Sequence, residues 1–142
     1  MRPQAAPAIM ASMLPLSPPP IAAQAAPRAL PSGLQLRDLV EGTGPAATKG
    51  RRCSVHYTAW IWWGNRKGPR VDRSQDGAPI QFRLGRGEVI RGWDEGLEGM
   101  RTGGRRVLLV PPELAYGHAG AGGGTIPPDT ALCFELELLR VE

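Results

Sequence analysis

The sequence predicts an α+β domain in which an antiparallel β-sheet folds over one short α-helix. Apolar and polar residues alternate in several separate segments, which is the period of a half-buried strand. Residues 92–100 alone carry apolar side chains at the spacing of an amphipathic helix. Glycine and proline interrupt the chain between these segments, so each element is short. The 142 residues correspond to one domain with an aliphatic core from residue 33 onward.

The first half of the domain is predicted to be extended. A short strand begins at Leu34 and ends before residues 41–45, where Gly42, Gly44 and Pro45 signal a turn. Within residues 53–59, apolar side chains alternate with serine, histidine and threonine, which predicts a longer strand. Three further features follow along the chain, namely a turn at 64–69 and extended segments at 71–74 and 80–84.

The second half contains the helix and two more strands. The helix is predicted by apolar side chains spaced four and three residues apart, Trp93, Leu97 and Met100. Residues 105–110 form the next strand, which a pair of prolines closes. A long loop spans 113–128. In residues 132–138, leucine or phenylalanine alternates with cysteine or glutamate, which predicts a final strand with one exposed face.

Residues 1–32 differ in kind from the rest and are assigned to an N-terminal tail. They are rich in alanine and proline, and no acidic residue precedes Asp38. The prolines at 15 and 18–20 are incompatible with a regular helix. Two interpretations stay open. The segment is either a disordered tail or the remnant of a targeting segment, in which Ala23-Gln24-Ala25 fits the small-x-small pattern before a cleavage site.

Charge and residue spacing exclude several classes of function. Lysine and arginine number 17 and aspartate and glutamate 13, so the net charge is only +4. The basic residues are scattered, and we expect them to be solvated rather than to bind nucleic acid: Arg51, Arg52, Arg66, Lys67, Arg70, Arg73, Arg105 and Arg106. No apolar run reaches the ~18 residues of a membrane-spanning helix. His118 has no second histidine or cysteine nearby, so neither a metal nor a cofactor is expected.

Three short segments carry the side chains that point to a binding pocket, Glu88-Val89-Ile90-Arg91-Gly92-Trp93, Leu114-Ala115-Tyr116-Gly117 and Ile126-Pro127-Pro128. They offer one indole, aliphatic walls and a phenol, but no paired acid and base. Such a set suits an apolar ligand that is held or twisted rather than one whose bonds are broken. A proline ring with its preceding amide is the natural candidate. The competing interpretation is that these are ordinary core and turn residues.

With these segments in hand, residues 33–142 resemble the FKBP family of peptidyl-prolyl isomerases, the macrolide-binding immunophilins. Four more segments occur in the family's order, Val55-His56-Tyr57-Thr58, Val71-Asp72-Arg73-Ser74, Phe82-Arg83-Leu84-Gly85 and Phe134-Glu135-Leu136-Glu137-Leu138-Leu139. Seven segments in register make the resemblance specific. Residues 32–34, 102–106 and 111–114 look most like plant and algal members of the thylakoid lumen, and somewhat like bacterial members.

The resemblance implies an apolar pocket between sheet and helix, with Trp93 as its floor. Tyr116 would offer its hydroxyl and Ile90 its backbone N–H to substrate carbonyls, and Asp72 would lie at the rim. The expected catalytic set is therefore Tyr57, Asp72, Ile90, Trp93 and Tyr116. The expected substrate-binding set is Val71, Phe82, Val89, Ile126 and Phe134.

The function implied by this pocket is peptidyl-prolyl cis-trans isomerisation during protein folding. Rotation of a prolyl amide breaks resonance across a barrier of roughly 18–20 kcal/mol, and an apolar pocket penalises the polar planar amide more than the twisted one. The alternative function is that of an FKBP-like binding or assembly module with little turnover. Proline-containing polypeptides are the expected partners of a monomeric chain. The expected compartment is the thylakoid lumen, with the cytoplasm as the alternative.

Two features depart from the family's pattern. Val71 and Ile80 stand where the family often has phenylalanine, so rapamycin-like macrolides should bind weakly, at about 0.8 kcal/mol per buried methylene lost. The segment between Tyr57 and Asp72 is longer than in small members of the family. It carries three tryptophans that either pack on the end of the sheet or form a docking patch, Trp60, Trp62 and Trp63.

The two cysteines are predicted to be free thiols. Cys53 shares the strand face of Tyr57 and should point to the core, whereas Cys133 alternates with Phe134 and should point away from it. A disulfide requires converging Cβ atoms, which this arrangement does not provide.

Overall fold

The computed structural model describes residues 27–74 and 78–142 of the chain. Most of the expected tail or targeting remnant, residues 1–26, lies outside the described residues. The described part of that segment includes strand β1 (Arg28–Ala29), which pairs with strand β2 (Gln35–Val40). The Leu30 side chain, which follows β1, packs against the hydrophobic core.

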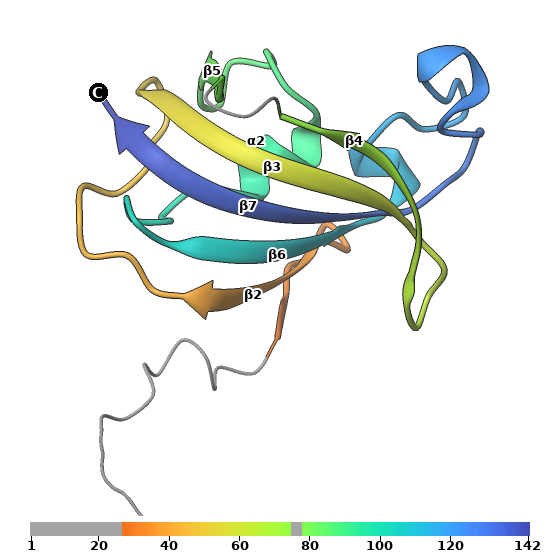
Figure 1. Cartoon of the computed structure of the whole chain (residues 1–142), viewed down its shortest axis with the longest axis horizontal. Helices are drawn as coiled ribbons and strands as arrows, with labels where there is room; N and C mark the ends of the chain where they lie inside the picture. The colour runs from red at the N-terminus through yellow and green to blue at the C-terminus, as the bar shows by residue number, and fades with distance from the viewer. Residues whose placement is uncertain (1–26, 75–77) are drawn as a thin grey trace, which may run out of the picture.

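Seven strands form one antiparallel sheet in the order β1-β2-β6-β7-β3-β4, and strand β5 pairs with β3 (Figure 1). The remaining strands are β3 (Arg52–Trp62), β4 (Lys67–Arg73), β5 (Ile80–Arg83), β6 (Arg105–Val110) and β7 (Leu132–Val141). The helix is α2 (Arg91–Gly96), and two 3₁₀ turns follow it, η2 (Pro112–Leu114) and η3 (Gly122–Gly124). This architecture confirms the α+β fold predicted from the sequence.

Strand β3 exchanges partners halfway along its length. Its first residues pair with β5, from Arg52 opposite Arg83 to Val55 opposite Ile80. Its last residues pair with β4, while β7 pairs with its other edge throughout. Strands β4 and β5 therefore share the same edge of β3, one after the other along its length.

Strand register separates an inner face, which packs on α2, from an outer face. The inner face forms the core because its residues are aliphatic or aromatic at every second position. Its buried members on β3, β6 and β7 include Val55, Ala59, Leu108, Leu136 and Leu138. Cys53 belongs to this core, as predicted, and both cysteines are free thiols.

Glycine lets α2 approach the sheet closely. A Cβ atom on Gly92 would lie 2.6 Å from Val110 Cγ1, and one on Gly96 would lie 2.7 Å from the Leu108 methyl carbons. Real Cβ atoms do not come so close to neighbouring side chains, so any larger residue would push the helix away from β6. Trp93 lies between the two glycines and is 4% exposed.

Arg106 ties the end of this helix to the sheet. The guanidinium is buried, although the sequence predicted a solvated side chain, and this prediction was wrong. Its Nε donates to Asp38 Oδ1 at 2.6 Å, and its Nη1 donates to the Gly96 carbonyl at 2.7 Å. The charge is acceptable in the core because the carboxylate and a free helix carbonyl both face it.

Strands β3 and β7 are a few residues longer than predicted, and the helix and strand β4 differ more from their predicted bounds. The helix ends at Gly96 rather than at Met100, and a turn completes the segment. Strand β4 begins at Lys67, inside the predicted turn, so Pro69 lies within a strand. Proline is tolerated there because β4 is an edge strand and Gly68 and Pro69 together face one residue of β3, which is a bulge.

We expect Arg106→Ala to lower the free energy of unfolding by about 2–3 kcal/mol, because it removes two charge-assisted hydrogen bonds from the core. Asp38→Asn should cost less, since an amide oxygen still accepts from the guanidinium. Urea denaturation of the two variants and the wild type measures both effects. Equal stability of Arg106→Ala and the wild type would show that the buried pair is not a stabilising contact.

Candidate functional site

A cavity of about 400 Å³ opens between the inner face of the sheet, α2 and the loop after β6. Its lining is Tyr57, Ala59, Asp72, Ile80, Glu88, Val89, Ile90, Trp93, Tyr116, Ile126, Leu132 and Phe134. Most of this surface is aliphatic or aromatic, and its polar groups stand at the rim. The volume is within the range of pockets that hold small ligands, at roughly 300–1,000 Å³.

Trp93, which the family resemblance assigned to the floor, is a buried residue of the cavity lining. Its indole meets two rings at near-perpendicular angles, Tyr57 at 4.9 Å and Phe134 at 5.5 Å between centroids. Edge-to-face contacts of this kind hold aromatic side chains in one orientation. The buried indole Nε1 has no hydrogen-bond partner within the described residues. The floor is therefore a rigid apolar plate with one unused donor.

Tyr57 and Asp72 form a polar pair at the rim. The Tyr57 hydroxyl donates to Asp72 Oδ2 at 2.6 Å, and Asp72 Oδ1 accepts from the Arg73 N–H at 2.8 Å. Strand register explains this meeting, because Asp72 lies opposite Ala59 and so shares the inner face with Tyr57. Val71 is an extra residue in β4 that has no counterpart on β3, and this bulge sets the orientation of Asp72.

The phenols of the site stay protonated. Burial raises the pKa of Tyr57 well above its ordinary value, and the hydrogen bond to Asp72 raises it further. Burial also raises the pKa of Tyr116, with a smaller contribution from the Asp72 charge. Neither group can act as a base near neutral pH, so both serve as hydrogen-bond donors. The site supports binding and orientation rather than proton transfer.

A network of backbone contacts positions the segment before α2. The Asp94 carboxylate accepts hydrogen bonds from the Gly85 and Gly87 amides at 2.8 and 3.1 Å. Glu88 Oε1 accepts from the Arg83 amide at 2.9 Å. These bonds hold the loop that carries Val89 and Ile90. The Ile90 N–H donates no hydrogen bond to another described residue and is therefore available to a ligand.

The loop after η2 closes the other side of the cavity. Ala121 and Ile126 exchange two backbone hydrogen bonds, at 2.9 and 3.0 Å, which form an isolated bridge at its tip. Ile126 is thereby buried against the cavity, while Tyr116 is 39% exposed at the mouth. The phenol can thus meet both a ligand and the solvent.

The structure brings eight of the ten predicted site residues to the cavity, Tyr57, Asp72, Val89, Ile90, Trp93, Tyr116, Ile126 and Phe134. Val71 does not line it, because the bulge turns this side chain aside to pack against the core. Phe82 lies below the floor, 5.8 Å from the Trp93 ring. Four lining residues were absent from the predicted sets, Ala59, Ile80, Glu88 and Leu132.

Two of these omissions had a signal in the sequence. Ala59 has the parity of Tyr57 on β3, and Leu132 has the parity of Phe134 on β7, so both belong to the inner face. Within residues 27–74 and 78–142, no group of three histidine, cysteine or acidic side chains gathers as a metal site. His118 instead contacts Asp129 at 3.2 Å on the surface.

Residues 44–139 match the family model described as FKBP-type peptidyl-prolyl cis-trans isomerase. An FK506-binding protein of Neisseria meningitidis serogroup B is 50% identical over 109 residues, which cover 77% of this chain and 96% of that protein. An FK506-binding protein of Streptomyces anulatus is 46% identical over 112 residues, covering 78% and 88%. The chloroplastic peptidyl-prolyl cis-trans isomerase FKBP13 of Arabidopsis thaliana is 46% identical over 120 residues, covering 77% and 56%.

Solved structures agree with these sequence matches. The crystal structure of AtFKBP13 superposes with a TM-score of 0.72 at 42% identity, covering 83% of this chain and all of that chain. FkpA from Escherichia coli superposes with a TM-score of 0.70 at 38% identity, covering 82% and 51%. The chain belongs to the FKBP-type peptidyl-prolyl cis-trans isomerase family. Family and fold together assign it the function of that family, and its bacterial relatives are as similar to it as the plant ones.

The raised pKa values predict a loss of stability at alkaline pH. A folded-state pKa above the unfolded tyrosine value of about 10 means that the folded chain holds its proton more tightly. This contribution is complete below about pH 10 and is lost as the pH rises further. We expect the free energy of unfolding to fall above that pH, and to fall less steeply in Tyr57→Phe.

Urea denaturation at a series of pH values measures these slopes. Tyr116→Phe is a useful comparison, since it removes a group whose pKa is raised but which has no hydrogen bond to Asp72. The same slope in the wild type and in Tyr57→Phe would contradict the raised pKa of Tyr57.

Proposed function

We propose that the cavity holds a prolyl ring against the Trp93 indole and lowers the barrier to rotation about the preceding amide. The observation that carries this proposal is the aromatic box of Trp93, Tyr57 and Phe134, which contains no base or nucleophile. The Ile90 N–H and the Tyr116 hydroxyl stand on either side as donors for substrate carbonyls. Binding and orientation are thus the chemistry available to the site.

This chemistry matches the requirements of amide rotation. The planar amide is polar because of resonance, and the twisted amide has lost that resonance and part of its carbonyl polarity. Removing the bond from water therefore costs the planar state more than the twisted state. A donor such as the Tyr116 hydroxyl holds the neighbouring carbonyl while the amide turns. No covalent step is involved, and the pKa directions of both tyrosines are consistent with donor roles.

The same cavity is also proposed to bind rapamycin-like macrolides weakly. Relatives carry the name FK506-binding protein, and the cavity has the apolar character that such a ligand needs. Ile80 lines one wall, where an aromatic side chain would offer more contact area. We therefore assign the chain a lower affinity for rapamycin-like ligands than a pocket with an additional aromatic wall would have.

The partners proposed for the chain are proline-containing polypeptides, bound by a monomer. No helix among the described residues is both long and apolar enough to cross a bilayer. The chloroplastic Arabidopsis relative supports the thylakoid lumen as the compartment. The cytoplasm is the alternative, and the bacterial relatives, which are equally similar, leave it open.

We expect the purified chain to accelerate cis-to-trans exchange in a short peptide with an apolar residue before proline. The uncatalysed reaction takes tens to hundreds of seconds, so a stopped-flow or coupled assay resolves the difference. Proline-limited refolding of a test protein extends the assay to a folding substrate. An uncatalysed rate from a folded sample would favour the alternative function, a binding module with little turnover.

Asp72→Leu should lower kcat/KM by about one to two orders of magnitude, because the Tyr57 hydroxyl loses the acceptor that fixes the orientation of its phenol at the rim. Asp72→Asn retains an acceptor and should lose less. Asp72 is exposed, so the melting temperature should change little in either variant. Unchanged activity in Asp72→Leu would remove Asp72 from the site, and a collapsed melting curve would make it a structural residue.

A further inference from the structure

The three tryptophans of the β3–β4 hairpin do not form a single patch. Lys67 Nζ lies 3.9 Å from the centre of the Trp60 ring, and Arg66 covers Trp63 at 5.3 Å. Trp63 also packs so closely on Gly68 that a Cβ atom there would lie 2.7 Å from its ring. Trp60 and Trp63 are therefore occupied by side chains of their own hairpin. Trp62 has a different environment, because it lines a groove on the outer face of the sheet.

This outer groove has a volume of about 340 Å³ and runs across β2, β6 and β7. Strand register shows why it forms. Leu109 lies opposite both Gln35 and Cys133, and Val107 lies opposite Arg37 and Glu135, so all of these side chains share the outer face. The apolar part of the lining is Pro27, Leu39, Trp62, Val107, Leu109 and Cys133, and Leu36 borders it although it is opposite Leu108 and belongs to the core.

The outer groove and the prolyl cavity are separated by the thickness of the sheet. Phe134 lines the cavity, whereas its neighbours Cys133 and Glu135 line the groove. Side chains of successive strand residues point to opposite faces, so no residue of β7 serves both sites. The two sites can accordingly be occupied at the same time. A ligand in the groove would not compete with a prolyl substrate.

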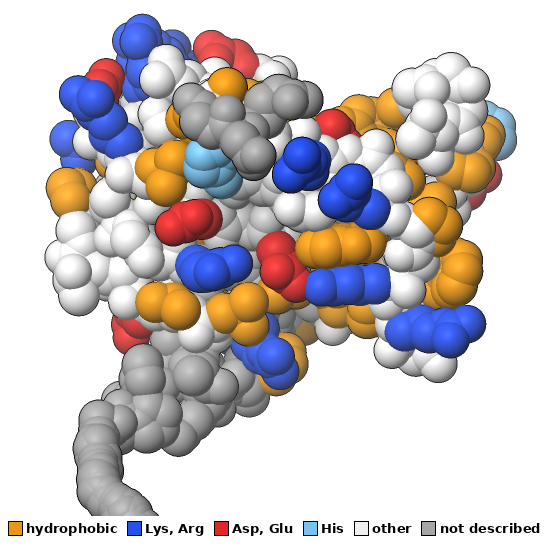
Figure 2. Space-filling model, viewed as in Figure 1, with side chains coloured by type: hydrophobic (Ala, Val, Ile, Leu, Met, Phe, Trp, Pro, Cys, Tyr) orange, Lys and Arg blue, Asp and Glu red, His pale blue; other side chains and the backbone are white. Residues whose placement is uncertain are grey.

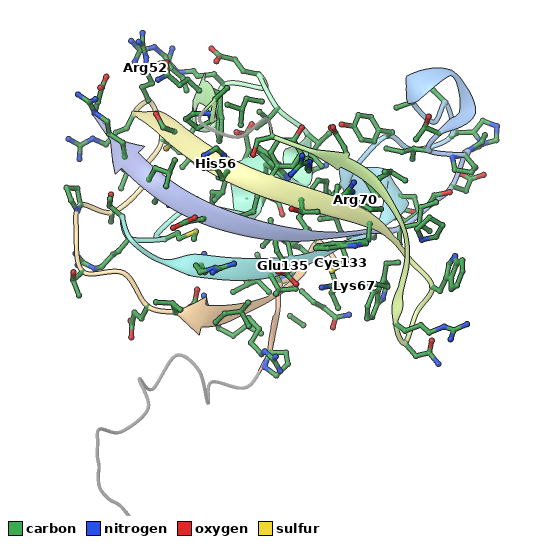
Figure 3. All side chains as sticks on the ribbon, viewed as in Figure 1. Arg52, His56, Lys67, Arg70, Cys133 and Glu135 are labelled. Atoms are coloured by element: carbon green, nitrogen blue, oxygen red, sulfur yellow. The ribbon has the colours of Figure 1, made fainter. Side chains whose placement is uncertain are left out.

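The margins of the outer groove are basic. Exposed Arg37 stands at one side, and Lys67 stands at the other, in contact with Glu135. Figure 3 shows Lys67 and Glu135 beside Cys133 on this face, with Arg70 on the adjoining strand β4. In Figure 2, basic and acidic side chains both stand beside hydrophobic ones on this face of the molecule. The groove therefore combines an apolar floor with a border of two basic side chains and one carboxylate, whose net charge is positive.

The apolar floor and the charge of the border together favour one class of ligand over the others. A second copy of the chain would bring two basic borders together, and like charges would oppose the contact. A nucleic acid would need a continuous row of phosphate contacts, which this mostly apolar lining does not offer. A polypeptide with apolar side chains fills the floor, and an acidic residue beside them meets Arg37, while a second one would compete with Glu135 for Lys67.

We propose that the outer groove is a second polypeptide-binding site, which takes an apolar segment flanked by acidic residues. It does not require proline and acts independently of the prolyl cavity. The site would hold a partner protein, or a distant segment of a folding client, while the prolyl cavity works on another part of the chain.

The test uses a short fluorescein-labelled peptide with leucine and valine at alternate positions, glutamate at both ends and no proline. Fluorescence anisotropy measures its binding to the full chain. A second peptide, with lysine at both ends, is otherwise identical. We expect the acidic peptide to bind more tightly than the lysine peptide. We also expect saturating acidic peptide to leave the isomerisation of a short prolyl peptide unchanged.

Two variants locate the site. Leu109→Glu places a carboxylate on the apolar floor and should weaken binding of the acidic peptide by at least about tenfold. Leu139→Glu is its matched control, since Leu139 is a 38% exposed leucine of β7 outside the groove. Arg37→Glu reverses one border and should reverse the preference between the two peptides. Arg52→Glu is the control for charge, because Arg52 lies at the far end of the sheet from Lys67 (Figure 3).

Activity toward the short prolyl peptide reports folding of each variant, since none of these residues lines the cavity. If Leu109→Glu is unfolded, the peptide preference of Arg37→Glu decides the question. No binding of either peptide would overturn the proposal. Equal losses in Leu109→Glu and Leu139→Glu would also overturn it, as would inhibition of isomerisation by the acidic peptide. A dimer that Leu109→Glu dissociates in sedimentation analysis would instead assign the groove to a second copy.

Discussion

The close approach of α2 to β6 sets the depth of the prolyl cavity. Gly92 and Gly96 let the helix backbone approach the side chains of Val110 and Leu108, and Arg106 holds the helix end through the Gly96 carbonyl. Trp93 lies between these glycines, and its indole is therefore held against the Tyr57 and Phe134 rings of the sheet. A helix displaced by the width of one methyl group would lift the floor and change the orientation of every wall.

Periodicity in the sequence was sufficient to predict the sheet, the helix and which face of each strand is buried, because alternation is a local property. The family resemblance named most of the residues that line the cavity, because it rests on short segments that are also local. Val71 is absent from the cavity lining and lies at a bulge, which changes the direction of a side chain without leaving a mark in the sequence. Arg106 was misjudged because its burial depends on Asp38, a partner 68 residues away that no local pattern reveals.

Alternate side chains of strand β7 line the prolyl cavity and the outer groove. Its inner residues give the cavity an aromatic wall, and its outer residues place a thiol and a carboxylate under the β3–β4 hairpin. Burial raises the pKa of Cys133 to about 11. The Lys67 charge lowers this pKa, and the Glu135 charge has a smaller effect that raises it. This thiol is consequently a weak nucleophile that behaves as an apolar side chain. Its position on the outer face, as the sequence predicted, does not make it accessible.

The place of β7 in the sheet also governs when the domain can fold during synthesis. β7 lies between β3 and β6, although it is made after both of them. Until residues 132–141 have left the ribosome, β3 and β6 each expose an unpaired edge, and the aromatic box lacks Phe134. Folding of the sheet is therefore delayed until β7 has been made and relies on pairings between distant parts of the chain, which form slowly. A nascent chain stalled before β7 would present open strand edges to other polypeptides and would be prone to aggregate.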